Sequence, residues 1–255
     1  MSITGKQSLP LDRSESPMRL TDLLLASVLT TIPLPTQAPA GRSPAAPSAQ
    51  EAKTAIAEME TAWPRWKPDE KIAAVGKLAA LGGTAVAKAL AARLDDPVPE
   101  VRRSLAASLG RLKDPKAIPA IPALAAALER EHGKDKGDLE TFKAIAKALG
   151  EIGDPKAIEP LTLHLLSGDR RDADWQAQAN ARLDALGGIR HKDAVEELIS
   201  LLGRTGGAGR RGGGGNNQLT KSIERNLQRL TGQNLRDQNA WRSWWKDNRD
   251  KFRFS

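Results

Sequence analysis

The amino-acid sequence predicts an all-α protein, a right-handed α-solenoid built from helix hairpins. A motif of the form Leu-Gly-x-(Leu/Ile)-x-Asp-Pro-Lys-Ala-Ile occurs at residues 109–118 and again at 149–158, forty residues later. On both sides of each copy, apolar residues recur at spacings of three and four, as they do on one face of a helix. Self-similarity at this period is typical of arrays of helix pairs, in which each pair buries its apolar face against its neighbours.

Two hairpins are expected in the first half of a solenoid spanning residues 51–203. The first has helices at 70–81 and from Thr84, the expected N-cap, to about residue 94. The second has a helix at 100–112 and a partner that begins after Asp114-Pro115. Pro119 and Pro122 follow closely, and proline inside a helix removes hydrogen bonds, so this partner helix should begin loosely or bend.

The second half of the solenoid repeats the pattern. Residues 139–152 should pair with a helix running from Asp154-Pro155 to about residue 166, and 174–186 with 193–202. Gly110 and Gly150 are expected to let the two helices of a pair approach closely. The residues expected in the core are Leu105, Leu109, Ile118, Ile145, Leu149, Ile158, Leu161, Leu183 and Leu198.

The segment 95–103, Asp-Asp-Pro-Val-Pro-Glu-Val-Arg-Arg, continues into Leu109-Gly110 and Asp114-Pro115. In this unit the chain resembles the HEAT-like repeat of the PBS lyase type, and the likeness is good again over 143–161. Across residues 68–203 the resemblance implies a solenoid but little about function, because the family includes scaffolds, lyase subunits and hydroxylases. In such repeats, arginines like Arg102 and Arg103 pair with acidic residues of a neighbouring turn, and we expect the same structural role here.

The C-terminal part is expected to close the array. A flexible Gly- and Arg-rich linker at 204–218 precedes a basic helix pair at 219–255, and Asp237 is the expected cap of its second helix. An aromatic stripe on that helix predicts a buried cap, with an exposed stacking platform for bases or sugars as the alternative. This end resembles the ends of secreted HEAT-repeat proteins of planctomycete-type bacteria. The cap residues are Trp241, Trp244, Trp245 and Phe252.

Charge is concentrated at the same end. Residues 41–203 hold 24 Lys/Arg and 24 Asp/Glu, whereas residues 204–255 hold 12 Lys/Arg against four Asp/Glu, which accounts for the net charge of +8. A localised basic segment favours an anionic partner, although a solvated surface is the simpler interpretation. The candidate partner-binding residues are Arg204, Arg210, Arg211, Arg225, Arg229, Arg242, Lys246 and Arg249.

The N-terminal segment 1–40 has the layout of a signal peptide. A basic start at Met18-Arg19, an apolar run at 23–32 and the small residues Ala38-Pro39-Ala40 are followed by a Pro/Ala/Ser linker at 41–50. If translation begins at Met18, the layout predicts export to the periplasm or the cell exterior of a bacterium. If Met1 is the start and the run is not cleaved, it predicts a cytoplasmic protein with a disordered tail. The run is too short to span a bilayer, so no integral membrane association is expected.

The sequence offers little for catalysis. It has no Cys, and its histidines, His132, His164 and His191, show no spacing that a metal ion could share across one helix face. No nucleophile elbow or phosphate-binding loop is present. We therefore expect a non-catalytic scaffold without cofactors that binds an acidic protein or peptide. The alternatives are a nucleic-acid-binding repeat protein that uses the basic C-terminal segment, and a lyase-type enzyme subunit or chaperone.

Overall fold

The computed structural model describes residues 49–112, 115–132, 137–169, 171–205, 214–235 and 237–254. The chain divides into two units, residues 1–45 and 46–255, and all the described residues belong to the second. Regular structure in this described part is helical, without a strand. The expected signal segment at 1–40 lies outside the described residues, as do Arg210 and Arg211.

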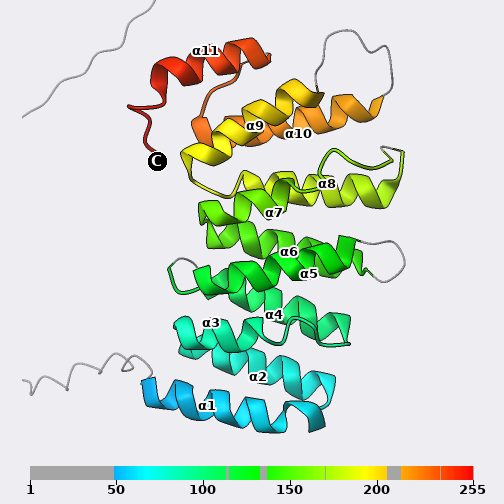
Figure 1. Ribbon diagram of the computed structural model, residues 1–255, viewed down its shortest axis with the longest axis vertical. Helices are drawn as coiled ribbons and strands as arrows, with labels where there is room; N and C mark the ends of the chain where they lie inside the picture. Colours follow the sequence, from blue (N-terminus) through cyan, green and yellow to red (C-terminus); the bar gives the residue numbers. More distant parts are fainter. Residues whose placement is uncertain are drawn as a thin grey trace, which may run out of the picture. The chain divides into compact units, whose positions relative to one another are not determined.

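The helices are arranged in two layers, and the chain crosses from one to the other in each hairpin (Figure 1). The first layer contains, each packed on the next, α2 (Pro68–Leu81), α4 (Pro99–Leu112), α6 (Leu139–Ile152), α8 (Ala173–Leu186) and α10 (Gly214–Thr231). The second contains α3 (Thr84–Ala91), α5 (Ile121–His132), α7 (Ile158–Thr162), α9 (Lys192–Thr205) and α11 (Gln238–Asn248). A preceding helix, α1 (Ala49–Ala62), packs on α2 and α3. The predicted all-α solenoid is confirmed.

One continuous core runs between the layers. Seven of the nine predicted core residues are buried, whereas Ile118 and Ile158 are only partly buried. Ile118 is the first residue of the 3-10 turn η2 (Ile118–Ala120), and Ile158 is the first residue of α7, directly after the 3-10 turn η3 (Pro155–Ala157), so both lie beside a change of helix type. The change from three to 3.6 residues per turn rotates the apolar stripe at that junction. The loose start predicted for the helix around Pro119 is confirmed by η2.

Helix ends differ from the prediction in three places. Thr84 is the first residue of α3 and not its cap, because Gly82 and Gly83, with φ of 67° and 92°, make the turn through backbone freedom alone. Helix α9 continues to residue 205 and α10 begins at residue 214, so helix occupies both ends of the expected linker at 204–218. Asp237, the predicted N-cap, accepts a hydrogen bond from the backbone N–H of Ala240, which confirms it, and Asp154, where a helix was expected to begin, accepts one from the backbone N–H of Lys156.

Helix α7 is the third difference, since it ends at Thr162 and not near residue 166. His164 has φ of 58°, the one positive value at a non-glycine residue in the described part of the chain. The helix ends because Leu163 has an extended ψ of 131°, and the left-handed residue that follows cannot resume a right-handed helix. Leu163 is left 46% exposed as a consequence.

Gly110 and Gly150 do allow a close approach, but between different helices from those predicted. A Cβ on Gly110 would lie 3.0 Å from the Cα of Ala148 on α6, and a Cβ on Gly150 would lie 2.7 Å from the Cα of Ala185 on α8. Both glycines therefore bring consecutive helices of the first layer together, and not the two helices of one hairpin.

Candidate functional site

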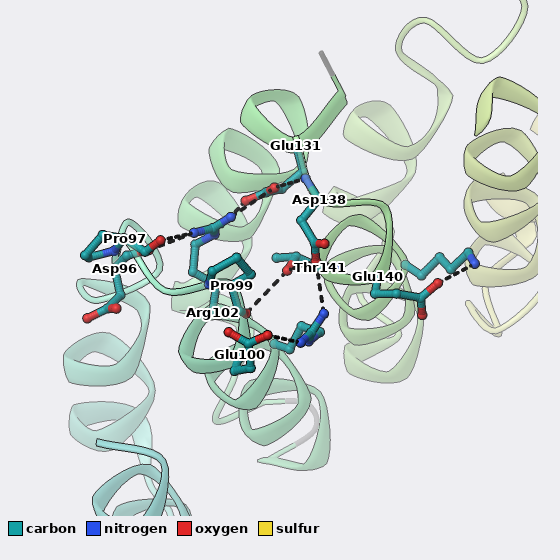
Figure 2. Close-up of polar contacts among 11 residues, drawn as sticks. Asp96, Pro97, Pro99, Glu100, Arg102, Glu131, Asp138, Glu140 and Thr141 are labelled. Carbon is teal, nitrogen blue, oxygen red and sulfur yellow. Dashed lines mark hydrogen bonds and ion pairs between the residues drawn. The ribbon is translucent and has the colours of Figure 1, made fainter. Parts of the chain in front are cut away.

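Arg102 joins successive repeats in the way expected of a structural ladder (Figure 2). Its Nε donates to Glu131 Oε1 at 2.7 Å, and one terminal nitrogen donates to the backbone carbonyl oxygens of Asp96 at 2.9 Å and Pro97 at 3.2 Å. Glu131 is 3% exposed, so this ion pair is largely withdrawn from solvent. The hydrogen bonds of Arg102 thus go to the Glu131 carboxylate and to two backbone carbonyl oxygens, which fits a structural role.

Arg103 makes the next step of the ladder. It contacts Glu100 at 2.7 Å and Asp138 at 3.2 Å, and Asp138 in turn caps α6 by accepting the backbone N–H of Thr141 at 2.7 Å. The hydrogen bond from the Thr141 hydroxyl, with a smaller effect from the charge of Arg103, lowers the pKa of Asp138 even though burial acts against it. The two arginines thus hold α4, α5 and α6 in register, and the predicted pairing with acidic residues is confirmed.

A groove of about 820 Å³ lies across the first layer of helices. Its walls come from α4, α6, α8, the turn after α8 and α10, that is, from three successive repeats and the start of the terminal pair. Small residues make up much of its lining, because the first-layer helices meet through glycine and alanine. These small residues are Gly110, Gly150, Ala177, Ala181, Ala185 and Gly188.

Charged side chains surround this small-residue surface. Of its four cations, Lys143 pairs with Glu140 at 2.7 Å and Lys147 with Glu151 at 3.6 Å. The other two cations, Arg111 and Arg229, have hydrogen-bond acceptors of a different kind. Arg111 donates to the hydroxyl of Ser108 at 2.9 Å, and Arg229 donates to the backbone carbonyl of Asp184 at 2.7 Å. The hydrogen bonds that the structure gives these two exposed guanidinium groups therefore go to neutral acceptors.

The predicted basic residues of the C-terminal segment do not form one face. Arg229 lines the groove from α10, whereas Arg249 pairs with Glu196 of α9 at 2.8 Å. Because α10 and α11 belong to different layers, cations on the two helices are divided between them. Arg204 pairs with Glu197 at 2.6 Å. The remaining described members of the predicted set, all exposed, are Arg225 on α10 and Arg242 and Lys246 on α11.

Sequence reasoning missed Arg111, Lys143 and Lys147, although a signal for one of them was present. Arg111 and Glu151 occupy the same position of the repeated motif, directly after its glycine. Positions that keep a fold are alike in the two copies, while this position changes charge. A residue that changes next to a constant glycine is therefore one that the fold leaves free to vary.

The tryptophan stripe packs against the array. Trp241 is 1% exposed, and the buried Trp245 donates its indole N–H to Glu196 of α9 at 3.2 Å. Trp244 and Phe252 are partly buried and meet edge to face, with ring centroids 5.9 Å apart. This arrangement is that of a cap and leaves little ring surface for stacking bases or sugars.

Within the described segments, few side chains are arranged so that they could bind a metal ion or catalyse a reaction. His132 and His164 stack with ring centroids 5.5 Å apart, but within these segments no three His, Asp or Glu side chains lie close enough to hold a metal ion. No described helix is long and apolar enough to cross a membrane.

Comparison with known families places the fold in a class. Residues 64–136 match the family described as HEAT repeats, and residues 143–167 match the PBS lyase HEAT-like repeat. No curated protein matches the chain. With its hairpins stacked in two layers, this is a HEAT-like repeat protein. Repeats of this class commonly mediate protein interactions and are typically non-catalytic.

Proposed function

We propose that the protein is a non-catalytic scaffold that binds a peptide segment of a protein partner in the groove across α4, α6, α8 and α10. The observation that carries the proposal is the groove itself, because a volume of about 820 Å³ is in the range of specific ligand sites. Its small-residue lining leaves room for the side chains and backbone of a bound segment. The fold class supports the choice of a protein ligand, since solenoids present extended surfaces to other chains.

The partner is proposed to be acidic and to be met outside the cytoplasm. Four Lys/Arg against two Asp/Glu line the groove, and the adjoining C-terminal segment carries the whole excess of positive charge. Such a field attracts anionic partners and raises their rate of association. The signal-peptide layout of residues 1–40 supports export, and mass spectrometry of the natural protein tests it: a mature chain that retains residues 20–40 would refute export.

Selection from a displayed random-peptide library tests the proposal. Peptides enriched on the wild-type protein should lose binding to Ala177→Trp, because the indole would fill the groove that Ala177 lines. Ala57→Trp, at an exposed position on α1, is the matched control and should bind normally. Failure to enrich any peptide, or equal binding to both variants, would overturn the proposal.

Nucleic-acid binding is a second candidate, favoured by the exposed Arg242 and Lys246 on α11. These cations lie outside the groove, so the two hypotheses make different predictions. Duplex or single-stranded oligonucleotides should then bind with log affinity falling against log salt by roughly 0.7–0.9 per phosphate contacted. Loss of that binding in the double variant Arg242→Glu/Lys246→Glu, with Ala177→Trp unaffected, would support this second function.

A further inference from the structure

We infer that the groove selects a segment with acidic residues at its two ends and neutral residues between them, held by Arg111 and Arg229. The inference rests on the proposed function and adds to it the charge pattern of the ligand. It comes from how the charges of the lining are distributed over the four helices, and which of them already have carboxylate partners.

The two arginines stand on the outermost helices of the groove. Helices α4, α6, α8 and α10 follow one another in the layer, so Arg111 on α4 and Arg229 on α10 are separated by α6 and α8. The inner helices contribute Glu151 and Asp184, which oppose a carboxylate in the middle. Read across the layer, positive charge lies at the two ends on α4 and α10, while α6 between them is balanced because Glu151 pairs with Lys147, and α8 carries the carboxylate of Asp184.

The lysines do not disturb this pattern. Lys143 and Lys147 both lie on α6, and each has a carboxylate within 4 Å on the same helix, so their charges are locally balanced. A guanidinium group has five N–H donors, and Arg111 and Arg229 each spend one terminal nitrogen on a neutral oxygen. The donors that remain match the two oxygens of a carboxylate, which arginine binds in a bidentate geometry that lysine cannot reproduce.

Arg229 is also held in place by the turn after α8. A Cβ on Gly187 would collide with the Arg229 guanidinium and with Asn226, whose Cγ would lie 2.7 Å away. Asn226 itself donates to Asp184 Oδ1 at 3.3 Å, which keeps this carboxylate occupied beside the arginine. The absence of a side chain at Gly187 thus lets Arg229 reach across from α10 to α8 and present its free edge at the end of the groove.

The length of the ligand follows from the packing of the helices. Axes of packed helices lie about 8–10 Å apart, so three steps from α4 to α10 amount to roughly 25 Å. An extended chain advances about 3.3 Å per residue, so the two acidic groups should be separated by about seven residues. The segment between them meets Gly150, Ala181 and Ala185, which accommodate small uncharged side chains.

Fluorescence anisotropy with two peptides of identical composition tests the pattern. One carries two glutamates at each end of six Ser and Ala residues, and its isomer carries all four glutamates in the centre. The first should bind at least about tenfold more tightly than the second, because only its carboxylates reach both guanidinium groups. Equal affinities, or no binding of the first peptide, would overturn the inference.

Variants assign the effect to the two arginines. Arg111→Gln and Arg229→Gln should each weaken binding of the first peptide by about fivefold to tenfold, whereas Arg242→Gln on α11 should change it by less than about twofold. Thermal unfolding of each variant separates binding from helix stability. If the arginines only support helix ends, their variants would have a lower melting temperature but an unchanged affinity, and that result would also overturn the inference.

The failure of the charge pattern can be distinguished from the failure of the proposed function. If library peptides bind, lose binding to Ala177→Trp and bind both arginine variants as tightly as wild type, the proposed function stands and only the charge pattern fails.

Discussion

Gly150 on α6 and Ala185 on α8 are in backbone contact: a Cβ on the glycine would lie 2.7 Å from both the Cα and the carbonyl oxygen of the alanine. Both residues also line the groove. This close approach between two successive repeats is therefore part of the surface proposed to bind the partner, and a change at this contact should alter stability and binding together.

Gly150→Ala should destabilise the protein by about 1–3 kcal/mol, because the added methyl group meets backbone that cannot move independently. Gly76→Ala is the matched control, since nothing lies within 4 Å of a Cβ at that position on α2. There the better helix propensity of alanine should stabilise by about 0.5–1 kcal/mol. Urea unfolding measures the change in the free energy of unfolding for both variants, and the two changes should have opposite signs. A stabilised Gly150→Ala protein would contradict this prediction, because it would show that α6 and α8 can separate at little cost.

Asp96→Ala should cost about 3–5 kcal/mol, because it leaves a largely buried ammonium group without its partner. Asp96 Oδ2 accepts from Lys71 Nζ at 2.7 Å and from the Trp63 indole N–H at 3.0 Å, which joins the first hairpin to η1 (Trp63–Arg65). Asp95→Ala, at the exposed neighbour, should change stability by less than about 0.5 kcal/mol. Similar losses in the two variants, measured by urea unfolding, would contradict this role of the buried network.

Arg182→Ala should also cost about 3–5 kcal/mol, whereas Arg182→Met should cost clearly less. The Arg182 side chain is 1% exposed, lies 5.1 Å from the centroid of the Phe142 ring, and donates to the Pro160 carbonyl at 2.6 Å and to Glu129 at 3.1 Å. Burial lowers the pKa of this arginine, although the hydrogen bond and the charge of Glu129 act in the opposite direction. Methionine retains the packing without that charge. Calorimetry on both variants tests the ranking, and equal losses would mean that the polar contacts outweigh the packing.

Removing the charge of Asp138 should make the free energy of unfolding depend less on pH in the acidic range. Its folded-state pKa is lowered, so its contribution is fully present above the unfolded value of about 3.9 and is lost as pH falls through the lower folded value. Asp138→Asn should be less stable than wild type by about 0.5–1 kcal/mol at neutral pH, because the contact with Arg103 is partly exposed. Urea titrations from pH 7 to pH 2 should show this gap closing below about pH 4. A gap that is constant over the whole range would contradict the assignment.

The helix boundaries could be predicted because they are set by local sequence, but the pairing could not: residues 139–152 were expected to pair with the helix that follows, whereas α6 packs on α5 of the second layer. Asp154-Pro155 and Gly82-Gly83 punctuate the chain wherever it turns, and the apolar spacing between such points is helical. The partners of Arg102 could not be predicted in the same way. Glu131 is 29 residues away, and only the packing of both α4 and α5 against α6 decides that it, and not the nearer Asp95, receives the guanidinium group.

The end of α7 and the groove escaped prediction for two different reasons. Residues 158–166 keep helical apolar spacing, so nothing in the local sequence marks the end of α7 at Thr162 or the left-handed backbone of His164. The groove depends on the order of four helices that are distant in sequence, and its residues are charged or small, which in a single helix look like an ordinary solvated face. Arg229 was predicted to bind a partner, but together with cations on α11 and not with Arg111.

The repeated glycine has a consequence for how such a protein can change in length. Gly110 meets Ala148 on the following helix of its layer, and Gly150, two residues beyond Ala148, offers the same bare backbone to the helix after that. A duplication of the forty residues between the two glycines would therefore keep the contact between glycine and alanine at each new junction. Gene duplication could in this way lengthen the array by whole units, and with it the surface for a longer ligand, with the ion pairs made by Arg102 and Arg103 as the contacts that the new junction would have to replace.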